Sequence, residues 1–193
     1  LVALAAFLLI GLLDSVHFRL ALPAMNATAT IQYSSEVTSL LDALAGGLRA
    51  RDEKTYSAPF ATHLYAKETV QRADGSQARE YPRLEYGGAH LADPARDRLP
   101  DILGLIAISI GEALVLWVVL LLGLAVLRSW HRDLPLRAMP GDMLSGRAGK
   151  HWPVLLLGIC LVIMLTTLAI NLSAHYHIFG TDKVGQDVFY QTL

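Results

Sequence analysis

The sequence contains a single cysteine and lacks the short motifs of the common catalytic sites. Cys160 can form no disulfide within the chain, so cysteine usage indicates no redox compartment. No G-x-S-x-G, H-E-x-x-H or G-x-x-x-x-G-K-[ST] segment occurs, so no hydrolase elbow, zinc-protease helix or phosphate-binding loop is predicted. The net charge of -1, without a basic stripe, does not suggest a nucleic-acid partner. We therefore expect no catalytic residue, metal or cofactor in this chain.

Charged residues are also nearly absent from two long apolar runs in a chain that is 53% hydrophobic. The run at 102–127 contains only Glu112, and the run at 153–173 contains no charge. Each is long enough to cross about 30 Å of hydrocarbon as a helix. The opening segment, 1–13, is shorter than the roughly 20 residues of a complete span. We interpret it as a truncated span, with a cleaved signal peptide as the alternative.

The polar segment 14–101, between the first two apolar segments, has the mixed charges and aromatic residues of a small folded domain. An apolar stripe at helical spacing, with Ser34 or Ser35 as N-cap, predicts an amphipathic helix there. Asp74 and Gly75 lie between two segments of strand character and predict a hairpin. The stripe consists of Val37, Leu40, Leu41, Leu44 and Leu48.

The predicted fold class is an α-helical membrane protein with three transmembrane helices, the first truncated. A small α+β extracytoplasmic domain is inserted between the first and second. Orientation follows from the short loop 128–152, which is rich in arginine and should be cytoplasmic by the positive-inside rule. Trp130 and Trp152 at its edges suit the headgroup level. Segments 14–101 and 174–193 are then expected outside.

The segment HIFGTDKVGQDVF, residues 177–189, lies in that last outer region. It resembles a motif of the permease subunits of bacterial peptide and nickel ABC importers, of the form H-x-[FL]-G-T-D-x-x-G-R-D-[VIL]. Gln186 stands where the family usually has arginine. The matching residues are His177, Phe179, Gly180, Thr181, Asp182, Gly185, Asp187 and Val188.

The resemblance implies a transport subunit of the bacterial inner membrane and not an enzyme. Because the motif precedes the transport core in that family, the chain is expected to be the N-terminal portion of a longer permease for peptides or similar small solutes. The implied partners are a second permease subunit, cytoplasmic ABC ATPases, a periplasmic solute-binding protein and the lipid bilayer. The alternative is a membrane-anchored sensor whose extracytoplasmic domain binds a ligand.

Residue properties alone predict a short helix beginning near Lys183, capped by Thr181 or Asp182. Val184, Val188 and Phe189 would share one face of that helix. Gly180 and Gly185 permit positive φ. A capped surface turn with no transport role is the alternative.

Glu112 is the candidate intramembrane polar site, since a carboxylate in hydrocarbon usually faces protein or water. It would belong to a solute or proton path, or it would be hydrogen-bonded to a neighbouring helix, which we favour. The candidate partners are Ser109, Thr166, Thr167 and Asn171.

The histidines give little indication of a metal site. His175 and His177 form an H-x-H pair, but two ligands are too few. His17, His63 and His90 are expected to be surface or loop histidines.

Overall fold

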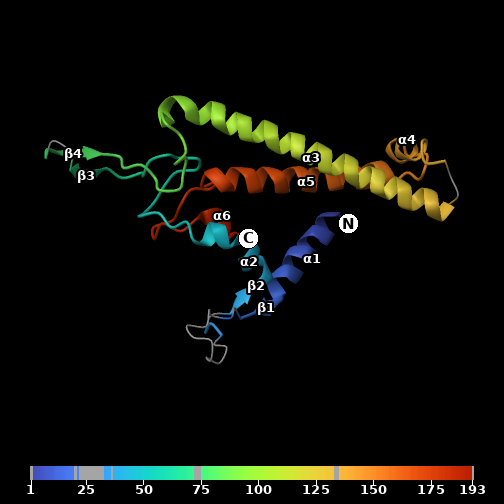
Figure 1. Ribbon diagram of the computed structural model, residues 1–193, viewed down its shortest axis with the longest axis horizontal. Coiled ribbons are helices and arrows are strands. Elements are labelled where there is room, and N and C mark those ends of the chain that lie inside the picture. The colour runs from blue at the N-terminus through green and yellow to red at the C-terminus, as the bar shows by residue number, and fades with distance from the viewer. Residues whose placement is uncertain are drawn as a thin grey trace, which may run out of the picture.

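Two long antiparallel helices, α3 (Pro94–Arg132) and α5 (Trp152–His175), form the axis of the molecule (Figure 1). The computed structural model describes residues 2–19, 21, 33–35, 37–71, 75–132 and 135–192. A short helix, α4 (Met139–Leu144), lies at one end of the pair, and the smaller elements gather at the other (Figure 1).

Both long helices are long and apolar enough to cross a membrane, since the most apolar stretch of each has a mean hydropathy of 2.6. The apolar runs at 102–127 and 153–173 lie within them. α3 begins earlier than its apolar run because Pro94 suits a first helical position and Asp93 caps the helix. The Asp93 Oδ1 accepts from the amide of Ala95 at 3.1 Å.

Small residues let α3 and α5 approach each other closely. Ala113 and Ala125 of α3 are buried, and Ala125 is fully enclosed. The Trp117 indole Nε1 donates to the carbonyl oxygen of Leu156 at 3.0 Å, which joins the two helices directly. A buried cluster continues this seam and consists of Leu121, Ala125, Met139, Met143 and Leu156.

The sequence analysis did not predict α4, which lies within the basic 128–152 loop. Met139 and Met143 of α4 are buried against α3 and α5. A helix of 6 residues is too short to show a periodic apolar pattern in the sequence. Packing of its two methionines against α3 and α5 stabilises it instead.

The predicted truncated span at residues 1–13 forms a helix but is not confirmed as a membrane span. α1 (Val2–Ser15) has 14 residues and no buried residue among them. It runs obliquely away from α5, beginning where Val2 lies close to Gly158 (Figure 1). At 1.5 Å per residue it extends about 21 Å, less than the roughly 30 Å of a bilayer core.

Two small antiparallel sheets occur in the 14–101 segment. β1 (His17–Phe18) pairs with β2 (Thr38–Ser39), and β3 (Glu68–Gln71) pairs with β4 (Gln77–Glu80). The second pair confirms the predicted hairpin, and Gly75 in its connection has φ +82°. Asp74 lies outside the described residues.

The predicted amphipathic helix exists as α2 (Leu40–Arg49), but the N-cap prediction at Ser34 or Ser35 is wrong. Ser39 is the cap, because its Oγ accepts from the Asp42 amide at 2.9 Å. The Asp42 carboxylate accepts from the Ser39 amide at 3.2 Å in return. Val37 precedes the helix, and Leu44 is 70% exposed, so the stripe is only partly buried.

Replacing the cap, Ser39→Ala, is expected to destabilise α2 by about 1 kcal/mol, since the substitution leaves the Asp42 amide without its acceptor. Hydrogen exchange at the Asp42 amide measures the effect. Ser15→Ala is the control, because the hydroxyl of that exposed serine donates to the Leu12 carbonyl of its own helix and does not cap α2. Unchanged exchange in Ser39→Ala would contradict the assignment of the cap.

Candidate functional site

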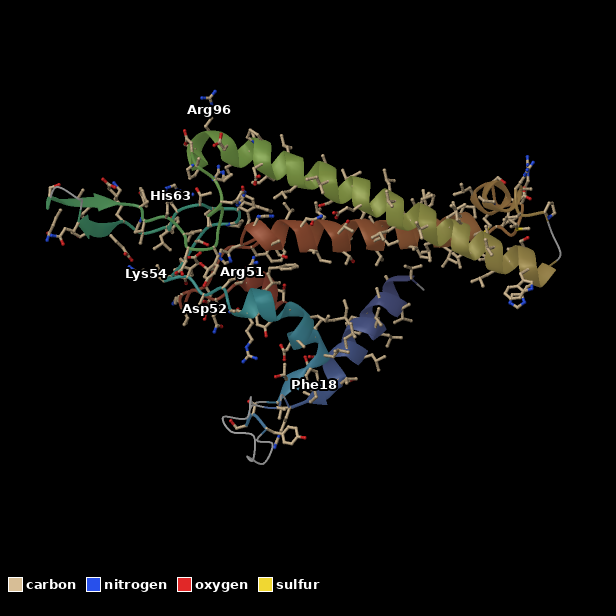
Figure 2. The ribbon with its side chains drawn as sticks, in the orientation of Figure 1. Phe18, Arg51, Asp52, Lys54, His63 and Arg96 are labelled. Atoms are coloured by element: carbon tan, nitrogen blue, oxygen red, sulfur yellow. The ribbon has the colours of Figure 1, made fainter. Side chains whose placement is uncertain are left out.

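The residues that follow α5 fold back against two earlier parts of the chain. Arg51 fixes the point of return, since its guanidinium donates to the carbonyl oxygens of Ser173 at 2.6 Å and Ala174 at 2.9 Å. Figure 2 shows Arg51 at this end of α5, with Asp52 and Lys54 beside it. A cation on the last carbonyls of a helix also stabilises its dipole. We call residues 177–191, together with Glu53, Thr55 and Ser57, the motif cluster.

A buried histidine bound to two carboxylates forms the centre of the motif cluster. The His177 Nδ1 lies 2.6 Å from the Asp187 Oδ2, and its Nε2 lies 3.3 Å from the Glu53 Oε1. All three residues are buried. Both ring nitrogens face acceptors, so the arrangement favours the doubly protonated imidazolium.

Glu53 ties this histidine to a third segment. Its Oε2 accepts from the Glu85 amide at 2.9 Å, and its Oε1 accepts from the amides of Tyr86 at 2.8 Å and Gly87 at 3.4 Å. Burial alone would raise the pKa of Glu53, but the hydrogen bonds from His177 and these amides outweigh it and lower the pKa. The carboxylate therefore stays ionised beside the histidine.

Burial and hydrogen bonding also oppose each other at His177, but here each shifts the pKa in the direction opposite to its effect on Glu53. Burial alone would lower the pKa of this imidazole, whereas the hydrogen bonds and negative charges of Asp187 and Glu53 raise it. The net result is a pKa of about 9. His177 is then a cation at neutral pH and, with both nitrogens donating, has no lone pair to act as a general base.

Asp187 has a second role as the N-cap of α6 (Val188–Gln191). Its Oδ1 accepts from the amides of Phe189 at 2.8 Å and Tyr190 at 3.3 Å, while its Oδ2 faces His177. The Tyr190 hydroxyl donates to the Asp42 Oδ1 at 2.7 Å, which links α6 to α2. One carboxylate thus positions both the histidine and the helix.

Gly180 and Gly185 occupy positions that admit no side chain. Their φ values are +76° and +89°. A Cβ at Gly180 would overlap the Ser57 carbonyl oxygen, and a Cβ at Gly185 would overlap that of Glu53. The chain approaches this closely because the Glu53 amide donates to the Gly185 carbonyl at 2.9 Å. Glycine is required here by both conformation and space.

Thr181 and Asp182 do not cap a helix, so the predicted helix near Lys183 is wrong. The buried Thr181 hydroxyl donates to the Thr55 carbonyl at 2.8 Å. The Asp182 Oδ1 accepts from the amides of Val184 and Gln186, each at 2.9 Å, which closes a turn. The positive φ of Gly185 prevents helix there, and α6 begins only at Val188.

The remaining motif positions lie at the surface of the cluster. Phe179 is 51% exposed and contacts Phe189 edge to face at 5.7 Å between ring centroids. Val188 is half-buried, whereas Val184 is 72% exposed, so the predicted shared apolar face with Phe189 is wrong. Gln186 accepts from the Gln191 Nε2 at 3.3 Å.

Sequence reasoning missed Arg51, Glu53, Thr55 and Ser57, although they hold the motif in place. Glu53 lies 124 positions before His177. No sequence motif links Glu53 to His177. Glu53 occurs in a polar stretch typical of a surface loop. Glu53 is recognised only in the structure, where it is the second buried carboxylate that accepts from the His177 ring.

Glu112 lies apart from the motif cluster, at an exposed position of α3. Its Oε2 accepts from the Asn171 Nδ2 at 2.7 Å, and that nitrogen also lies 3.0 Å from the Ser109 Oγ. The Thr167 hydroxyl lies 3.1 Å from the Ser109 carbonyl oxygen. Thr166 instead donates to Val162 of its own helix. Glu112 is thus hydrogen-bonded across the helix pair through one of the predicted partners, Asn171.

The histidines outside the cluster form no metal site in the described part of the chain, where no group of three or more candidate ligands occurs. His175 contacts His90 edge to face at 4.8 Å, and His177 is engaged by carboxylates on both sides. His17, His63 and His90 are exposed, in agreement with their interpretation as surface histidines.

No protein-family model, no curated protein and no solved structure matches this chain. The class therefore follows from the helices. Only 17% of the most apolar stretch of α3 and 11% of that of α5 are buried inside the molecule. The core helices of a soluble protein are mostly buried. Long, apolar and largely uncovered helices of this kind are typical of helical membrane proteins.

Proposed function

We propose that the chain is part of a permease subunit of a bacterial ABC importer for peptides or similar small solutes, in the inner membrane. The observation that carries the proposal is the fit between the motif and the motif cluster. The residue types that the motif specifies are the ones that this backbone needs: glycine at Gly180 and Gly185, and a histidine paired with an aspartate at His177 and Asp187. The matched residues thus act together in one packed unit, which supports interpreting them as a motif.

The position of the cluster also suits a permease. It directly follows α5, whose last carbonyl oxygens accept from Arg51, and the contact between His177 and Glu53 joins it to the 14–101 segment. With the basic 128–152 loop inside, the cluster lies on the outer face, where a periplasmic solute-binding protein would approach. It would hold the outer end of α5 rigidly to the outer domain. The permease partner and the ATPases would supply the alternating opening and the hydrolysis of ATP.

The first test is the reading frame beyond Leu193. The proposal expects further apolar spans and a cytoplasmic E-A-A loop with a downstream glycine, which would contact the ATPase. A soluble output domain would contradict it. Translation of the intact gene distinguishes the two.

Variants of the intact protein test the motif directly. Asp182→Ala removes the acceptor that closes the 182–186 turn, and Gly180→Val places a side chain against Ser57. We expect both to reduce uptake of a labelled tripeptide in a strain deleted for the gene, while His17→Ala retains it. Membrane abundance by immunoblot separates loss of transport from loss of protein. Equal uptake by all three variants at equal abundance would exclude the motif from the mechanism.

A sensor is the second candidate, and one observation favours it. A hollow of about 430 Å³ lies in the 14–101 segment, bordered by exposed Tyr65 and Tyr81. Its other lining residues are Ala58, His63 and Leu64. Aromatic and polar side chains around a hollow are suited to binding a small ligand. A soluble output domain after Leu193 would favour this function.

A further inference from the structure

We propose that the end of the molecule formed by α4 and the adjoining ends of α3 and α5 binds the headgroup of an anionic phospholipid. This inference does not depend on the transport function and requires only that α3 and α5 span a membrane. The site consists of basic side chains, which we call the basic end patch. Its described members are Arg128, Arg137, Arg147 and Lys150.

Arg128 is the inner member of the patch and is held in a fixed position. Its Nη2 donates to the Ala148 carbonyl at 2.8 Å, and its guanidinium lies 5.2 Å from the centroid of the Trp152 ring. The Nε is buried and has no hydrogen-bond partner in the described part of the chain. Because the side chain as a whole is only half-buried, the guanidinium held in this position can still donate to an incoming phosphate oxygen.

The outer members, Arg137, Arg147 and Lys150, come from the connection that holds α4 and are open to solvent. The Arg147 side chain is 81% exposed, and its Nη1 reaches only 3.9 Å from the Asp142 Oδ1, which leaves most of its donors available. Lys150 is exposed two residues beyond Ala148, and Arg137 is exposed just before α4. The resulting positive charge is suited to an anionic partner.

Apolar groups next to these charges identify the partner as a lipid and not a free anion. Trp130 is 82% exposed near the end of α3, Leu136 precedes α4 at 48% exposure, and Leu144 is the last residue of α4 at 45% exposure. Figure 1 shows α4 beside the end of α3, where the two apolar helices finish. Charges beside exposed indole and leucine side chains suit a phosphate with acyl chains attached.

Native mass spectrometry of the intact protein in detergent tests the site. Phosphatidylglycerol, phosphatidylcholine and inorganic phosphate are titrated separately. We expect adducts of phosphatidylglycerol at concentrations where the other two give none. Each basic side chain at an anionic surface changes affinity roughly fivefold, so Arg147→Gln with Lys150→Gln should weaken binding about 25-fold. These exposed residues can change without removing the contacts of Arg128 with Ala148 and Trp152.

Arg96→Gln is the matched control, because Arg96 is an exposed arginine at the opposite end of α3 (Figure 2). Its affinity for phosphatidylglycerol should equal that of the native protein. Equal binding of the two phospholipids would overturn the proposal, as would equal weakening by Arg96→Gln and the double variant. Phosphate binding as tight as that of phosphatidylglycerol would show a free-anion site and would also overturn it.

Discussion

Gly185→Ala is expected to detach the motif cluster from residues 53–57. The new methyl group would meet the Glu53 carbonyl oxygen, and backbone atoms cannot rotate aside as a side chain can. The left-handed φ of +89° adds a further cost of about 1–2 kcal/mol for any residue with a Cβ. Together these should destabilise the cluster by on the order of 3 kcal/mol.

Hydrogen exchange at the Glu53 amide reports this opening, since that amide donates to the Gly185 carbonyl at 2.9 Å. A loss of about 3 kcal/mol corresponds to roughly a hundredfold faster exchange. Gly75→Ala is the matched control. Gly75 has a similar φ of +82°, but among the described residues, its chain neighbours aside, no atom lies within 4 Å of the position that its new methyl group would take, so the conformational cost dominates. Equal exchange at Glu53 in both variants would show that the close approach does not stabilise the cluster.

The contrast between these glycines also shows what the sequence reveals and what it does not. Both are recognisable as glycines that can adopt a positive φ, Gly75 in a D-G turn segment and Gly185 in the polar stretch that follows Asp182. Nothing in the sequence indicates that one of them contacts the backbone of residue 53. That contact depends on packing between distant segments, whereas φ depends on local sterics.

The same division applies to the helices. The apolar runs predicted α3 and α5 because twenty or more apolar residues with at most one charge leave few alternatives. Within short segments, competing local interactions decided the outcome. Ser39 became the cap of α2 because Asp42 lies three residues further on, and Asp182 formed a turn because Gly185 follows it. From sequence alone, neighbouring serines look equally able to cap α2, and Thr181 and Asp182 look equally able to cap a helix. The residues that follow them, Asp42 and Gly185, decide which structure forms.

The stability of the motif cluster is expected to fall as the pH rises from about 6.5 to about 9. The folded pKa of His177 is raised to about 9, whereas an unfolded histidine has a pKa of about 6.5. Between these values the folded state binds the proton that the unfolded state has released. The stabilisation is therefore fully present below about pH 6.5 and is lost as the pH rises through about 9. Its size is on the order of 3 kcal/mol.

Glu53 does not contribute to this loss of stability at alkaline pH. Its folded pKa is lowered, so its stabilisation is present above the unfolded pKa of about 4.5 and is lost as the pH falls through its folded pKa. The two groups therefore act in separate pH windows. Maximum stability of the cluster is expected between them, at about pH 5 to 6.5.

Thermal unfolding of the intact protein at a series of pH values from 6 to about 9.5 measures the slope. His177→Gln keeps a side chain that can donate to one carboxylate but does not titrate, so it should be less stable at pH 6 and lose the slope. His131→Gln is the control, because His131 is exposed at the far end of α3. It should keep both the native stability and the slope. A slope that survives in His177→Gln would show that another group binds the proton, and the carboxylates of Glu53 and Asp187 would then hold a neutral imidazole.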